Sequence, residues 1–105
     1  HLIDAERIFA YRALRIVRDD STALPGFDEN HYVVAANANE REFESLLKEY
    51  CVVRDATICL FENFSATDLL KLGTASDASV SVRGIGYCVL GHELHHKQII
   101  IERYL

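Results

Sequence analysis

The sequence is poor in the residues that cross-link a chain or break its helices. It has one proline, no methionine, no tryptophan and three cysteines. An odd number of cysteines without the short spacings of a Cys-x-x-Cys pair argues against both a disulfide framework and a thiolate zinc site. We therefore expect Cys51, Cys59 and Cys88 to be reduced and buried, as in a cytoplasmic protein.

Long apolar runs are also missing, because charged residues interrupt every hydrophobic segment. None approaches the ~18 consecutive apolar residues that a membrane span requires, so no membrane partner is expected. No signal peptide is visible. The chain begins with His1 rather than methionine, and an upstream segment is therefore expected to be absent from it.

Positive charge is in deficit as well. Eleven Lys and Arg face sixteen Asp and Glu, a formal net charge of -5, which argues against a general nucleic-acid binder. Arg12, Arg15 and Arg18 recur at helical spacing and form a potential basic ridge. We favour a solvated helix face whose charge is balanced by Asp4 and Glu6.

The apolar residues recur mostly at helical spacing, within one expected domain, residues 1–105. Predicted helices cover residues 1–19, 40–62, 66–72 and 82–104. Asn39 with Glu42 and Ser65 with Asp68 are typical of capping boxes, and Ser81 is a further candidate cap.

The segments between these helices are predicted as connections. Residues 19–30 hold the only Pro-Gly step and are predicted as a long loop, and residues 31–40 as a docking segment or short helical turn. Residues 74–81 are polar and are predicted as turns, with Gly73 ending the short helix before them. The predicted fold class is therefore all-α, an up-down helical bundle without strands. Three long helices leave such a bundle incomplete, so we expect a missing N-terminal helix or a homodimer that covers the exposed face.

The most informative segment is GHELHHKQIIIERYL, residues 91–105. His92 and His96 are four residues apart and project from one face of a helix, a spacing at which two imidazoles can share one divalent ion. That face is the apolar stripe of the helix, so the pair should point into the bundle. Glu93 and Lys97 should point elsewhere.

The same letters match the H-E-x-x-H motif of zinc peptidases, with Glu93 as general base. The nine residues after His96 contain no further histidine, and no predicted sheet edge would hold a peptide. We regard a peptidase as the least supported interpretation.

A third ligand is available at the other end of the chain. His1 opens the first helix and would complete a three-histidine site that keeps a coordination position open for water or substrate. The alternative is a terminal residue without a role. His31 is predicted on the surface, and His95, rotated away from the pair, is a candidate contact of the ligands rather than a ligand.

Three segments together resemble the DinB-like superfamily of bacterial metal-binding four-helix bundles: HLIDAERIFAYRALRIVRDD, LPGFDEN and SVRGIGYCVLGHELHHKQIIIERYL. The resemblance covers nearly the whole chain and joins an H-x-x-D segment to an H-E-x-H-H segment. It implies a metal site formed by His1, His92 and His96. It also implies a helix before the H-x-x-D segment, which this chain lacks. Asp4 is then a candidate to orient a ligand imidazole through a hydrogen bond.

The resemblance implies a zinc or nickel ion and a small-molecule substrate, with a low-molecular-weight thiol among the candidates. It favours a thiol-dependent transferase or a hydrolase, in which the metal activates a thiol or a water molecule. The alternative is a non-catalytic metal- or ligand-binding bundle in which the histidines are structural.

Overall fold

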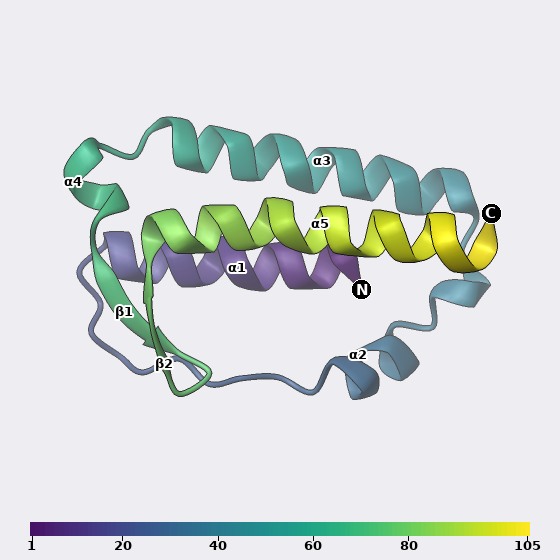
Figure 1. Ribbon diagram of the computed structural model, residues 1–105, viewed down its shortest axis with the longest axis horizontal. Coiled ribbons are helices and arrows are strands. Elements are labelled where there is room, and N and C mark those ends of the chain that lie inside the picture. Colours follow the sequence, from purple (N-terminus) through teal and green to yellow (C-terminus); the bar gives the residue numbers. More distant parts are fainter.

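Three long helices dominate the structure, a computed structural model that describes all of residues 1–105 (Figure 1). The elements in chain order are α1 (Leu2–Val17), α2 (Glu29–Ala36), the 3-10 helix η1 (Ala38–Glu40), α3 (Phe43–Glu62), α4 (Ala66–Leu69), β1 (Leu72–Ala75), β2 (Ala78–Ser81) and α5 (Val82–Tyr104). The protein is mostly helical, as predicted, but the expectation of a fold without strands is wrong.

The three long helices occupy three corners of a four-cornered bundle. The backbone of α1 comes close to those of both α3 and α5, whereas α3 and α5 meet mainly through side chains (Figure 1). The corner opposite α1 is therefore open, and an apolar cavity of about 400 Å³ lies there between α3 and α5, lined by Phe61, Tyr87 and Leu90 among others. That a further helix or a second copy of the chain covers this face stays a prediction.

The best-buried apolar cluster sits at one end of the antiparallel α1 and α5. Ala13, Ile16 and Val17 from α1 pack there against Val82 and Ile85 from α5. His1 lies at the opposite end of α1, fifteen residues before Ile16, which is about 22 Å at the helical rise of 1.5 Å per residue. This cluster therefore holds α1 and α5 together at one end. At the other end, where His1 lies, other contacts must hold the two helices.

Residues 72–81 form an antiparallel hairpin, so the turns predicted for residues 74–81 are wrong and the predicted helix 66–72 ends earlier, at Leu69. Ser76 and Asp77 both have positive φ, 51° and 62°, as a tight two-residue hairpin turn requires. Gly73 lies within β1 and does not end a helix. A Cβ atom there would lie 2.5 Å from Cγ1 of Ile16, so glycine allows the strand to approach α1.

The loop after α1 is fastened to this hairpin. Leu24 pairs with Ala75 as an isolated parallel bridge. Arg12 donates hydrogen bonds to the Pro25 carbonyl (3.0 Å) and to Oγ of Ser76 (3.1 Å). Arg12 is only 8% exposed, so the predicted solvated face is wrong for this residue.

The helix starts agree with the sequence in two places and differ in one. Ser65 and Asp68 form the predicted capping box, and Ser81 caps α5 by accepting from the Gly84 amide. The predicted Asn39 cap is wrong, because α3 begins after Glu42 without a side-chain cap. The chain continues through α2 and η1 before it reaches α3, and Asn39 falls inside η1.

All three cysteines are free, but each is exposed, so the expectation that they are buried is wrong. Among the helices, none combines the length and the apolar character that crossing a membrane would require.

Candidate metal centre

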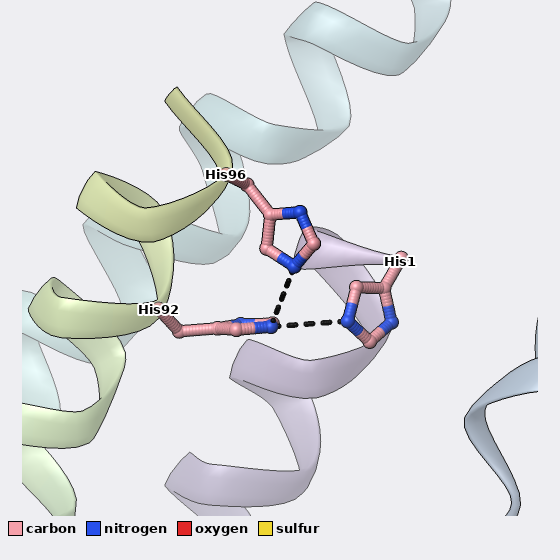
Figure 2. Close-up of side chains that lie close together, drawn as sticks. All are labelled: His1, His92 and His96. Carbon is pink, nitrogen blue, oxygen red and sulfur yellow. Dashed lines mark hydrogen bonds between the residues drawn. The ribbon is translucent and has the colours of Figure 1, made fainter. Parts of the chain in front are cut away.

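Three histidine side chains converge where the start of α1 meets the second half of α5. His92 and His96 project from consecutive turns of α5, as their spacing predicts, and His1 approaches from the first residue of the antiparallel α1 (Figure 2). The Nε2 atom of His92 lies 3.0 Å from Nε2 of His1 and 3.0 Å from Nε2 of His96. The structure therefore brings together the three residues that the sequence nominated, as Figure 2 shows.

The donor chemistry of the cluster fits a cation better than mutual hydrogen bonds. A ring nitrogen has one position in the ring plane, which holds either a proton or a lone pair. The Nε2 atom of His92 cannot satisfy two equally close partners through that one position. Two nitrogens bound to one ion at about 2.0–2.1 Å are roughly 2.9–3.4 Å apart for bond angles between 90° and 109°. The two 3.0 Å separations from His92 lie in this range. The ligand atoms of His1 and His96 are farther apart, with all three within 4.8 Å of one another, so these two imidazoles would close toward a bound ion.

The surroundings favour the neutral form of His92, which is the form that binds metals. Burial lowers the pKa of His92, and the neighbouring His96 lowers it further. The ring of Phe9 packs edge-on against His92 with 5.9 Å between the ring centroids. His1 is exposed and His96 is half-buried, so the cluster is open to small molecules on the His1 side.

The two residues proposed to support the ligands lie close to the cluster without bonding to it. Asp4 lines the same cavity as His1, but its carboxylate forms no hydrogen bond with an imidazole in the structure. The ring of His95 lies 5.2 Å from that of His96, nearly at right angles, and does not enter the cluster. Their roles stay predictions.

The family of the chain follows from a match to a protein-family model. The model of the DinB superfamily matches residues 1–100, almost the full length of the chain. The chain belongs to the DinB superfamily. No curated protein and no solved structure matches it significantly.

In this DinB-superfamily chain Glu93, the glutamate of the H-E-x-x-H motif, forms hydrogen bonds with residues of α3 rather than with the histidines. Glu93 accepts hydrogen bonds from the Tyr50 hydroxyl and from Nη1 of Arg54 (3.2 Å). These partners lower the pKa of Glu93, while burial and Glu93 together raise the pKa of Tyr50 to about 12. Glu93 thus lacks the position of a peptidase general base.

The cavity beside His1 is a feature that the sequence did not reveal. It measures about 460 Å³ and draws its walls from α1, α2, η1 and α3. Its lining residues are His1, Ile3, Asp4, His31, Tyr32, Ala35, Ala36, Ala38, Arg41, Leu46 and Glu49. His31 is exposed, as predicted, and in addition lines this cavity. No local spacing in the sequence relates it to His1, because α2 follows a long loop and its position depends on contacts distant in sequence.

Electrostatics at this cavity are locally balanced. Glu49 forms ion pairs with Arg41 (2.6 Å) and with Arg7, and these two arginines lower its pKa. Arg41 also donates to the backbone and hydroxyl oxygens of Ser45. The basic side chains near the cavity are therefore held in place, and the mixed polar and apolar walls suit a small amphipathic molecule.

Proposed function

We propose that this DinB-superfamily chain binds one divalent metal ion through His1, His92 and His96 and acts as a metal-dependent enzyme on a small molecule. The observation that carries the proposal is the convergence of three Nε2 atoms with 3.0 Å separations from His92. Histidine ligands suit zinc or nickel, and either metal fits this donor set.

Metal of this type supplies Lewis acidity, which lowers the pKa of a coordinated water or thiol. The residues of the chain would hold the metal, shield it and admit the substrate. The three imidazoles bind through Nε2, Phe9 shields one side of His92, and the cavity beside His1 admits a substrate of limited size. This arrangement supports a thiol-dependent transferase, with a low-molecular-weight thiol as co-substrate, or a hydrolase.

A non-catalytic metal- or ligand-binding protein is the second candidate. The observation that favours it is the lack of a free acid or base on the cluster, since Glu93 is bonded to Tyr50 and Arg54 and Asp4 contacts no imidazole nitrogen. In that case the metal would only join α1 to α5.

The test is metal content per chain after reconstitution with zinc and with nickel. We expect about one equivalent in the wild type and almost none in His92→Ala. His95→Ala is the matched control, because it removes a neighbouring imidazole outside the cluster, and it should keep one equivalent. Negligible metal in the wild type would refute the site.

Catalysis is then tested separately on the metal-loaded protein. A panel of small thiols with electrophiles, and of hydrolysable esters and amides, should show turnover that disappears in His92→Ala. Full metal occupancy without turnover across the panel would favour the non-catalytic candidate.

A further inference from the structure

We propose that Arg54 of α3 is a positioning residue for the three-histidine cluster, holding the two ligand-bearing helices at the spacing that brings His1 to His92 and His96. This inference rests on the proposed metal site. Arg54 touches none of the histidines and acts through one carboxylate on each of the two helices.

The contacts of Arg54 reach both helices at once. Its Nε and Nη2 atoms donate to the carboxylate of Glu6 on α1 at 3.1 and 2.8 Å. Its Nη1 atom donates to Glu93 on α5 at 3.2 Å. No other side chain of α3 bonds to both α1 and α5. The planar guanidinium suits this task, because its donors point in fixed directions toward two acceptors.

The place of these contacts along the helices matters more than their number. Glu93 directly follows the ligand His92, and Glu6 lies five residues, about 7.5 Å, after His1. The apolar cluster around Ile16 and Val82 lies at the other end of α1 and α5. Near the histidines α3 also reaches α5 through the hydrogen bond from Tyr50 to Glu93, but Arg54 is the residue of α3 that joins this carboxylate to α1 as well.

Burial makes the bridge sensitive to loss of the arginine. Glu6 is only 5% exposed, and a buried carboxylate without its partner is costly. Removing Arg54 would therefore drive Glu6 toward solvent and displace the first turns of α1. His1 would move with them, while His92 and His96 stay on α5.

The experiment compares Arg54→Met with Arg7→Met, using Co²⁺ and Zn²⁺ as probes. Methionine keeps most of the aliphatic stem and removes the charge. Arg7→Met is the matched control, because Arg7 also joins α1 to α3, through Glu49, but does not reach α5. Affinities are measured at a temperature at which circular dichroism shows every metal-free protein to be folded, so that a change in affinity does not report unfolding.

We expect Arg54→Met to bind both ions about 10–100-fold more weakly than the wild type, the usual loss when support behind a metal ligand is removed. The visible spectrum of the Co²⁺ form should change as well, because a displaced His1 alters the coordination geometry. Arg7→Met should keep the wild-type affinity within about twofold and the wild-type spectrum.

Two results would overturn the proposal. One is wild-type affinity and spectrum in Arg54→Met, and the other is an equal loss in Arg7→Met, which would indicate general loosening of α1 against α3. If Arg54→Met does not fold, Arg54→Lys decides: a positioning role requires weaker binding, because one ammonium cannot reproduce the fork, and wild-type binding would refute it. A wild type that binds neither ion would instead refute the metal site itself.

Discussion

Metal binding should raise the thermal stability of this protein by a large margin, and only through the histidine cluster. The cluster joins residue 1 to residues 92 and 96, at the end of the helix pair that the apolar core does not reach. Only 13 of 105 residues are buried, so the stability of the metal-free chain should lie toward the low end of the usual ~5–15 kcal/mol. Any added link is then a substantial fraction of the total.

The size of the effect follows from linkage. An ion present at 100 times its dissociation constant stabilises the folded state by about 2.7 kcal/mol. For a domain of this length each kcal/mol shifts Tm by about 4–8 °C. We therefore expect a rise of about 10–20 °C, which continues to grow with the logarithm of the ion concentration.

The assay is thermal unfolding of metal-stripped protein titrated with zinc or nickel, followed by circular dichroism. His95→Ala should show the same rise as the wild type, and His92→Ala should show almost none. A wild-type Tm that does not respond to either ion would refute the reasoning, and so would an equal rise in His92→Ala.

Three further predictions concern the rest of the chain. Gly91→Ala should raise the free energy of unfolding, measured by chemical denaturation, by about 0.5–1 kcal/mol, because alanine favours helix and a Cβ there meets nothing within 4 Å. Gly86→Ala should raise it less, since its Cβ would lie 3.0 Å from Phe61. The three cysteine thiols should all react with an aromatic disulfide reagent in the native protein, and a thiol that reacts only in denaturant would contradict their exposure. The lowered pKa values of Glu49 and Glu93 mean that their ionised forms stabilise the fold; this stability is complete above the ordinary glutamate pKa of about 4.5 and is lost as the pH falls through their folded values. The urea midpoint should therefore fall as the pH is lowered below about 4.5, less steeply in Glu93→Gln, and an equal slope in that variant would count against the ion pair.

The histidine cluster was predictable because local rules determine most of it. His92 and His96 are one helical turn apart, and a strong 23-residue helix with a Ser81 cap presents both on one face. His1 required more, since nothing in its own neighbourhood distinguishes a ligand from a terminal residue. The resemblance of the two histidine segments, taken together, supplied the third position.

The hairpin and the cavity were not predictable for the opposite reason. Residues 72–81 carry small and polar side chains without a clear alternation of apolar residues, and their strands are supported by partners far away in sequence, Ile16 and Leu24. Arg54 looks like one more charge on an amphipathic helix until the two carboxylates that it reaches are known. Tertiary contacts of this kind leave no periodic trace in the sequence.

The bridge between Leu24 and Ala75 has a consequence for the order in which the molecule opens. α2 contains no buried residue, and on its N-terminal side it is held in place by a loop that is itself fastened to a hairpin some fifty residues further along the chain. Amide hydrogens of α2 should therefore exchange with solvent faster than those of α1 and α5, through openings that leave the apolar cluster intact. Because the cluster is already open on the His1 side, such a local opening would widen the approach to the histidines, at a small fraction of the free energy of global unfolding.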